Sequence, residues 1–352
     1  MNLMKKITAA MLAAVMAAGL SACNAGGTAS SQPASSEAQG SFAVSAEQKP
    51  LEKVSFVLDY TPNTNHTGIY VAQQLGYFKD EGLEVDIQQP PEDGAVGLVG
   101  SGKAQFGIGF QDTDLAPALS SDSPIPVTAV AALIQHNTSG IVSEKSKNIT
   151  RPKEMEGHTY ATWDSPVEKA MVNYIIQKDG GDPAKLKMVP AGNDTVAAIR
   201  TNVDTGWIYY AWDGIAAQVQ GVQTNYFAFK DIDSVFDYYT PVLIANNDFL
   251  KNNPETAKKF LKAVQKGYRY AIDHPDDAAK LLIQAVPDLK SSEELVTKSQ
   301  KWLAGQYQAE VAQWGYIEPK RWNAFYQWLY DNKLIGKNIA DNTGFTNEYL
   351  PK

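Results

Sequence analysis

An acid, an aromatic ring, amides and an imidazole lie close together early in the chain. Residues 58–68 read Leu-Asp-Tyr-Thr-Pro-Asn-Thr-Asn-His-Thr-Gly, between a β-rich run and a helical pattern. In open α/β sheets, ligands bind at the carboxyl ends of strands. We therefore expect Asp59, Tyr60, Asn65 and His66 to face a small-molecule ligand. The alternative is that the asparagines only cap the helix and Asp59 only closes a turn.

A second segment combines aromatic rings with a carboxylate. Residues 207–214 read Trp-Ile-Tyr-Tyr-Ala-Trp-Asp-Gly. If a helical turn begins at Tyr209, Asp213 falls on the same face four residues later, and a flat heteroaromatic ligand could stack there. Trp212 belongs to the same candidate site. Trp207 and Tyr210 are better explained as core residues with polar tips.

A third candidate is residues 162–168, which read Thr-Trp-Asp-Ser-Pro-Val-Glu, where a strand-like run ends and a helix begins at Ser165. Ser165 and Glu168 have the spacing of a capping box, and a proline occupies the first helical position. A helix cap is the preferred interpretation for Ser165. Since a helix N-terminus also presents free N–H groups to a ligand, Glu168 is retained as a candidate ligand contact.

Neither a catalytic constellation nor a metal site is recognisable in the sequence. The four histidines show no close spacing of the kind that a zinc site uses, and neither HExxH nor GxSxG occurs. Cys23 is the only cysteine, which excludes a disulfide framework and a thiolate–metal site. We expect no catalysis, no cofactor and no metal.

The N-terminal residues are typical of an exported lipoprotein. Two lysines precede an apolar stretch that is too short to span a bilayer, and residues 20–23 read Leu-Ser-Ala-Cys. This motif resembles the bacterial lipobox, whose cysteine is lipidated. We expect residues 1–22 to be a signal peptide, Cys23 to carry the lipid, and residues 23–50 to form a flexible tether, because they contain almost no large apolar side chain. The alternative is a signal peptide with an incidental cysteine.

Size and charge limit the remaining possibilities. Residues 51–352 are more than one hydrophobic core usually holds, so two lobes are expected. The formal net charge is −8, and it falls to about −10 without the two lysines of the signal peptide. This balance argues against nucleic-acid binding, which needs a basic face.

The pattern of elements predicts an α/β architecture with parallel sheets, because short β-rich runs alternate with helical patterns. The predicted strands are 54–58, 85–88, 105–109, 127–133, 159–162, 187–190, 226–229 and 242–245. Helices are predicted after Gly68, Ala95 and Asp112, and from Ser165, Asp194, Pro254, Pro275, Ser291 and Pro319. The C-terminal helices have no sheet of their own and are expected to pack on a lobe.

Together these residues resemble the thiamine-pyrimidine-precursor-binding proteins, within a superfamily that also contains nitrate-, sulfonate- and taurine-binding proteins and fungal pyrimidine-precursor synthases. Besides residues 58–68, the resemblance is carried by 69–73, 76–83, 165–171, 209–214, 238–243, 267–268, 278–279, 299–300 and 302–303.

The resemblance implies a two-lobed periplasmic binding protein fold of type II, with an α/β sheet in each lobe. Lobe 1 would comprise residues 51–148 and 240–352, and lobe 2 residues 149–239. Hinges near 143–151 and 237–241 would let the lobes close over a ligand in the cleft between them.

The resemblance also implies a function, that of a substrate-binding lipoprotein of a bacterial ABC importer. The protein would be a monomer, held outside the cytoplasm on the cell membrane by its lipid. It would deliver a thiamine-related aminopyrimidine to the permease and ATPase subunits.

Individual residues carry over from the family pattern with two departures. Asp59 would hydrogen-bond the aminopyrimidine edge, and Tyr209 matches the stacking tyrosine. Tyr60 stands where the family usually has tryptophan, and Asp213 where it typically has glutamate. The shorter Asp213 would draw its carboxylate back by about 1.5 Å. A somewhat larger or differently substituted ligand could fill that space.

Other functions remain as alternatives. Fungal synthases keep a histidine in the region of His66, but they carry a cysteine-rich iron motif where residues 235–239 read Val-Phe-Asp-Tyr-Tyr here. A binding protein for a sulfonate would favour Arg or Ser/Thr donors, whereas Asp59, Asp213 and the aromatics suit a neutral or cationic ring. A riboflavin-like ligand and a purely adhesive lipoprotein also remain open.

Overall fold

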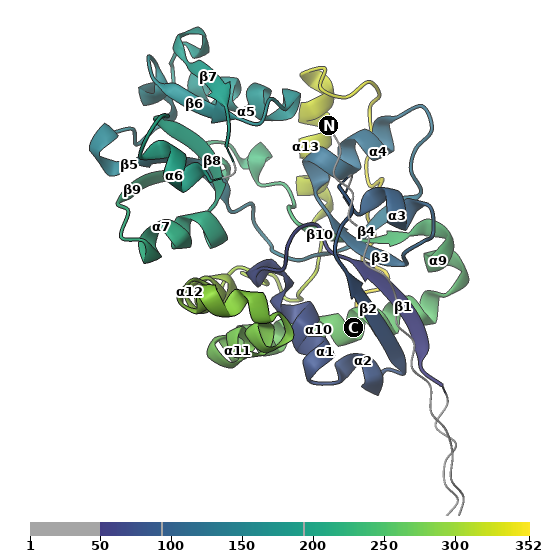
Figure 1. Ribbon diagram of the computed structural model, residues 1–352. Coiled ribbons are helices and arrows are strands. Elements are labelled where there is room, and N and C mark those ends of the chain that lie inside the picture. Colours follow the sequence, from purple (N-terminus) through teal and green to yellow (C-terminus); the bar gives the residue numbers. More distant parts are fainter. Residues whose placement is uncertain (1–49, 93, 193) are drawn as a thin grey trace, which may run out of the picture. The chain divides into compact units, whose positions relative to one another are not determined.

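Two five-stranded sheets organise the residues that the computed structural model describes, which are 50–92, 94–192 and 194–352 (Figure 1). The strand order is β2-β1-β3-β10-β4 in the first sheet and β7-β6-β8-β5-β9 in the second. The predicted signal peptide, Cys23 and the tether up to residue 49 lie outside the described residues.

The first sheet is mixed. Strand β1 pairs in parallel with β2 and β3, while β10 lies antiparallel between β3 and β4. The bounds of these strands are β1 Glu52–Val57, β2 Leu83–Gln88, β3 Phe106–Gly109, β4 Val127–Ala132 and β10 Val242–Asn246. All residues of β3 and β10 are buried, as expected for central strands covered on both faces.

Helices from both ends of the described chain cover the first sheet. The N-terminal ones are α1 Thr67–Gln74, α2 Tyr77–Asp80, α3 Val96–Gly100 and α4 Ala116–Ser120. The ring of Phe260 in α10 (Pro254–Asp273) stacks on Phe106 of β3 at 4.0 Å between centroids. Helix α10 crosses α1 so closely that a Cβ on Gly267 would overlap the carbonyl of Gly68, so this crossing requires glycine.

The second sheet is also mixed. Strand β6 pairs in parallel with β7 and β8, and β5 is antiparallel to β8 and β9. The strands are β5 Ser139–Glu144, β6 Thr159–Thr162, β7 Lys187–Pro190, β8 Thr205–Tyr209 and β9 Thr224–Ala228. The associated helices are α5 Pro166–Lys178, α6 Thr195–Ile199, α7 Ile215–Val219 and α8 Phe229–Ile232.

The C-terminal helices contribute buried residues to two hydrophobic clusters. Besides α10 they are α9 Asn247–Asn252, α11 Pro275–Ala285, α12 Glu293–Ala304 and α13 Pro319–Asp331. Helices α10 to α12 contribute to one cluster and α13 to the other. Helices α10, α11 and α13 begin at the predicted prolines. In α13, Phe325 stacks on Tyr238 at 4.0 Å, which ties this helix to the chain that leads into β10. Among the described residues, no helix is both long and apolar enough to cross a bilayer.

The structure corrects three structural expectations. Both sheets contain antiparallel neighbours, so neither is purely parallel. Strand β5 pairs within the second sheet, although the predicted boundary at residue 148 places it in lobe 1. The chain therefore passes from the first sheet to the second at residues 133–138 and not at the predicted hinge 143–151. It returns through residues 229–241, which include the predicted hinge 237–241.

Candidate ligand-binding pocket

A pocket of about 500 Å³ collects residues that follow the carboxyl ends of strands from both sheets. Asp59 and Tyr60 follow β1, Trp163 follows β6, and Tyr209 is the last residue of β8. This is the position predicted from the general rule for α/β sheets. The volume lies within the range usual for small-molecule sites. Further lining residues include Asn65, Phe110, Ile134, Thr138, Thr195, Trp207, Trp212, Asp213 and Thr240.

His66 supports Asp59 from behind and does not line the pocket. Its Nδ1 accepts the backbone N–H of Asn63 at 3.1 Å, so the ring proton lies on Nε2, which donates to Asp59 Oδ1 at 2.7 Å. The imidazole has no exposed surface, whereas the Asp59 side chain is 5% exposed and reaches the pocket. The structure therefore separates the two residues: Asp59 lines the pocket, and His66 holds its carboxylate from the buried side.

The asparagines divide between capping and lining. Asn63 precedes a single 3-10 turn over Thr64–His66, and its Oδ1 accepts the N–H of Asn65 at 2.9 Å. Together with the bond to His66 Nδ1 this forms a reciprocal cap. The capping alternative thus holds for Asn63, although it also lines the pocket. Asn65 lines the pocket, and its carbonyl accepts the hydroxyl of Tyr268 at 2.6 Å.

Tyr209 and Asp213 meet in the pocket through a different turn from the predicted one. Strand β8 continues to Tyr209, and a π-helical turn then spans Tyr210–Gly214. The N–H of Tyr209 donates to Asp213 Oδ2 at 3.2 Å. Burial, with a smaller contribution from the nearby Asp194, raises the pKa of Asp213 to about 6. Trp212 lies in the same turn and also lines the pocket.

Carboxylates dominate the electrostatics around the pocket. Neither lysine nor arginine occurs among the described residues that line it. Behind Phe110, burial raises the pKa of Asp114 to about 6, although the N–H of Phe110 opposes this shift by donating to Asp114 at 2.9 Å. Burial also raises the pKa of Asp112, which accepts the hydroxyl of Tyr238 at 2.9 Å. The pocket therefore favours hydrogen-bond donors and positive charge over anions.

The structure places Glu168 outside the pocket lining. Its buried carboxylate accepts the hydroxyl of Tyr160 at 2.8 Å, the hydroxyl of Thr162 at 2.9 Å and the N–H of Trp163 at 3.0 Å. The predicted capping box is wrong: Ser165 occupies the N-cap position of α5, but its side chain makes no capping hydrogen bond. Glu168 turns instead towards the end of β6, where three donors compensate the burial of its charge.

Several lining residues were not among the predicted ligand contacts, and the most prominent is Trp163, which lies within the third candidate segment. Half of its surface is exposed, which is unusual for so large an apolar side chain. Its place directly after a strand, next to Asp164, was the available signal. Trp207, assigned to the core by its composition, is only 4% exposed, yet it also lines the pocket.

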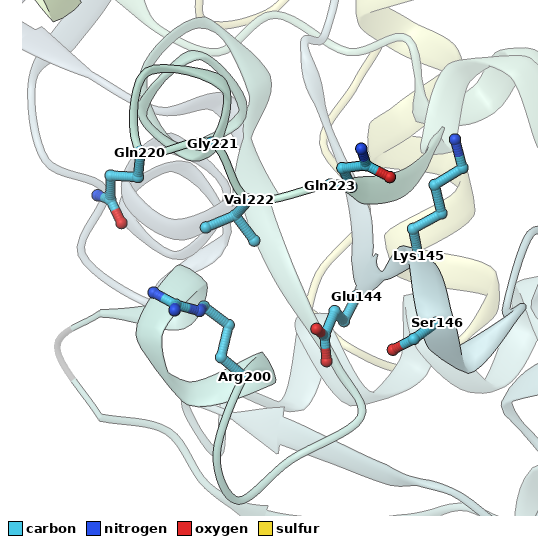
Figure 2. Close-up of a pocket in the computed structure, with 8 residues that line it drawn as sticks. All are labelled: Glu144, Lys145, Ser146, Arg200, Gln220, Gly221, Val222 and Gln223. Carbon is cyan, nitrogen blue, oxygen red and sulfur yellow. The ribbon is translucent and has the colours of Figure 1, made fainter.

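A second hollow, of about 560 Å³, lies at the opposite end of β5 (Figure 2). Strand register shows the separation: Ser139 pairs with Tyr209 at the pocket end, and Ser143 pairs with Thr205 at the other. Figure 2 shows Glu144, Arg200 and Val222 around this hollow. No aromatic side chain is among its described lining residues, so it offers no stacking surface for a heteroaromatic ligand.

Comparisons with known proteins agree with this architecture. The model of the family described as NMT1/THI5 like matches residues 63–278. The formylaminopyrimidine-binding protein of Halalkalibacterium halodurans is 27% identical over 308 residues, covering 86% of this chain and 92% of that protein. The 4-amino-5-hydroxymethyl-2-methylpyrimidine phosphate synthase THI11 of Saccharomyces cerevisiae is 28% identical, covering 85% and 88%.

A solved structure shows the same fold at low sequence identity. The alkanesulfonate-binding protein SsuA of Xanthomonas axonopodis pv. citri, bound to MOPS, superposes with a TM-score of 0.63 at 11% identity. The superposition covers 85% of this chain and 99% of that one. Because the family match spans more than half of the sequence, this chain belongs to the NMT1/THI5-like family.

Proposed function

We propose that this protein is the substrate-binding component of a bacterial ABC importer and that it captures a thiamine-related aminopyrimidine in the pocket described above. One observation carries the proposal. The pocket combines two carboxylates, Asp59 and Asp213, with the aromatic side chains of Tyr209 and Trp212, and its described lining contains neither lysine nor arginine.

The carboxylates match the hydrogen-bonding edge of an aminopyrimidine. Such a ring presents an amino group beside a ring nitrogen, and protonation of that nitrogen turns the edge into two donors. Asp59, oriented by His66 at 2.7 Å, can accept both through charge-assisted hydrogen bonds. Asp213 offers a second acceptor for substituents elsewhere on the ring. Stacking on Tyr209 or Trp212 would contribute about 1 kcal/mol each.

The names of two relatives support the same ligand class. The Halalkalibacterium halodurans protein is named for binding a formylaminopyrimidine, and the yeast protein for making the phosphate of an aminopyrimidine. Both matches cover at least 85% of this chain, so they include every residue of the pocket from Asp59 to Pro241. An aminopyrimidine is the chemistry common to both names.

Binding without catalysis accounts better for the position of His66. Both ring nitrogens are engaged in hydrogen bonds within the protein, and the ring has no exposed surface, so His66 is not presented to a bound molecule. Residues 235–239 stand where the synthases carry their cysteine-rich motif, and they contain no cysteine. We therefore infer a binding protein and not an enzyme.

We place the protein outside the cytoplasm, anchored to the cell membrane through lipidated Cys23 and acting as a monomer with its permease and ATPase. Ligand capture would draw the two sheets and their helices together about the connections 133–138 and 229–241. The wild-type protein should incorporate radiolabelled palmitate, and the Cys23→Ser variant should not. Equal labelling of the two proteins, or no labelling of the wild type, would contradict the lipid anchor.

A ligand panel tests the proposed function. Melting temperatures would be measured with hydroxymethylpyrimidine, its formylaminomethyl analogue, thiamine, riboflavin and taurine. A ligand that binds only the folded protein stabilises it by RT ln(1 + [L]/Kd), which is about 2.7 kcal/mol at 100 times Kd. We expect a clear rise in melting temperature with a pyrimidine and none with taurine. A rise with taurine alone would contradict the ligand class.

A further inference from the structure

We infer that Trp163 covers the bound ligand and helps to set specificity, and that Glu168 is the positioning residue that holds Trp163 at the mouth of the pocket. This inference rests on the proposed function of the same pocket. It assigns a ligand contact to Trp163, which was not among the predicted contacts, and it gives a role to Glu168, which the structure places outside the lining.

The first observation is the exposure of two rings at one pocket. Tyr60 is 66% exposed and Trp163 is 50% exposed, and both are lining residues. They come from different sheets, since Tyr60 follows β1 and Trp163 follows β6. Large aromatic surface left in water at one site indicates a surface that a ligand or partner covers. Here the two rings approach the same cavity from two separate sheets.

The second observation is the way the backbone at Trp163 is fixed. Its N–H lies 3.0 Å and 3.2 Å from the two carboxylate oxygens of Glu168. The next residue, Asp164, adopts a left-handed conformation with φ of 68°, and its N–H donates to Thr162 Oγ1 at 2.9 Å. Aspartate adopts this conformation more readily than most residues, and the bond to Thr162 Oγ1 fixes it here. The Trp163 backbone is therefore held in a defined turn.

The third observation concerns the carboxylate that holds this turn. Glu168 is 3% exposed, and the hydroxyls of Tyr160 and Thr162 donate to it as well as the N–H of Trp163. Every partner named here is a donor, so both oxygens of Glu168 serve as acceptors in this turn. In Glu168→Gln, the side-chain NH₂ group would face one of these donors, so that hydrogen bond would be lost. The turn would then be held less firmly, although the side-chain volume is almost unchanged.

The indole is supported on its inner side. Its ring centroid lies 5.8 Å from that of Trp207, and the ring of Trp207 lies 4.1 Å from that of Phe229. This aromatic row occupies the space behind Trp163, so the exposed half of the indole is available to a ligand. Tryptophan provides the best aromatic face for a cation, which suits a protonated pyrimidine in a pocket without basic lining residues.

Calorimetric titration with formylaminopyrimidine and with hydroxymethylpyrimidine tests both roles. Trp163→Ala should weaken binding roughly five- to tenfold, and Trp163→Phe less, because a smaller aromatic face remains. Tyr330→Ala is the matched control: Tyr330 is 42% exposed on α13 and is not a lining residue, so this variant should bind as the wild type does. Unchanged affinity of Trp163→Ala for both pyrimidines would overturn the ligand contact.

A double-mutant cycle separates positioning from general stability. Glu168→Gln should weaken binding several-fold in the wild-type background and have no further effect in Trp163→Ala, because it acts through Trp163. Equal effects in both backgrounds would overturn the positioning role. Quenching of tryptophan fluorescence by acrylamide gives a second readout. The part of the quenching that is present in the wild type and absent in Trp163→Phe comes from Trp163. This part should decrease when the wild type is saturated with ligand. If the wild type bound neither pyrimidine, the proposed function would fail, and this inference would fail with it.

Discussion

The Nε2 atom of His66 donates to Oδ1 of Asp59 across 2.7 Å, and the imidazole is completely buried. The N–H of Asn63 fixes the other side of the ring, so the tautomer that donates to Asp59 is the only neutral form consistent with both bonds. Asp59 and His66 were both predicted to contact a ligand, but only Asp59 lines the pocket, and His66 contacts Asp59 from behind. A carboxylate with one oxygen held in this way presents a defined direction to the pocket.

His66→Phe should weaken pyrimidine binding by roughly tenfold or more, but binding should remain measurable. The substitution keeps an aromatic ring but removes a hydrogen bond to a charged group, worth about 1.5–3 kcal/mol. Calorimetry on His66→Phe, Asp59→Asn and the double variant measures the coupling. The double variant should bind no worse than Asp59→Asn alone, and wild-type affinity in His66→Phe would contradict the orienting role.

Asp213→Asn should stabilise the ligand-free protein at neutral pH. Burial raises the pKa of Asp213 from 3.8 to about 6, so folding disfavours its charged form. The resulting penalty is absent below about pH 3.8, grows up to about pH 6 and is complete above it. At pH 7.5 we expect a gain of about 1–2 kcal/mol in the free energy of unfolding, because the side chain keeps some contact with water.

The pH dependence provides the control for this prediction. Asparagine can still accept the N–H of Tyr209, so only the charge is removed. Denaturant unfolding of Asp213→Asn at pH 7.5 and pH 4.5 should show a gain that shrinks at the lower pH. Asp231→Asn, at a side chain that is 69% exposed, should show no such trend. A constant difference between the two pH values would contradict the shifted pKa.

Phosphorylated ligands should bind far more weakly than their alcohols. Asp59 and Asp213 line the pocket, and its described lining offers no lysine or arginine to a phosphate. Like-charge contacts in a binding site cost several kcal/mol. Titration with hydroxymethylpyrimidine and with its phosphate should therefore differ by at least about a hundredfold in Kd. Equal affinity for the two would contradict a pocket that disfavours anions.

Arg321→Met should destabilise the fold. The guanidinium of Arg321, on α13, donates to the carbonyl of Gln135 at 2.6 Å and to Asp237 at 3.0 Å, which lie in the two connections between the sheets. Removing it takes away the arginine partner of the mostly buried carboxylate of Asp237, while His136 Nδ1 remains 2.7 Å from it. The loss of these charge-assisted hydrogen bonds should lower the free energy of unfolding by about 2 kcal/mol. Lys337→Met, at an exposed pair with Asp122, is the control and should change it by less than about 0.5 kcal/mol.

Local sequence patterns were sufficient for part of the fold and of the pocket. Prolines at the first helical position marked the starts of α10, α11 and α13. The rule that ligands bind at the carboxyl ends of strands brought Asp59 and Tyr209 to one pocket, although they are 150 residues apart. These features depend on short-range preferences or on a general property of α/β sheets.

The remaining features depend on pairing between distant segments. Strand β5 is a short run rich in serine and glycine, and it becomes a strand because β8 and β9 flank it. Aromatic residues occur both in β8 and in the π-helical turn that follows it, so the sequence does not mark where the strand ends. At Glu168 the spacing to Ser165 fitted a capping box, but donors on β6 draw the carboxylate away from the helix start.

The most direct test of the account is a calorimetric titration of formylaminopyrimidine into the wild-type protein and into Asp59→Asn at pH 7. We predict saturable binding at a single site in the wild type and at least tenfold weaker binding in the variant, because the amide cannot accept both donors of a protonated aminopyrimidine edge. Absence of binding in the wild type, or equal binding by the two proteins, would contradict the proposed carboxylate-centred site.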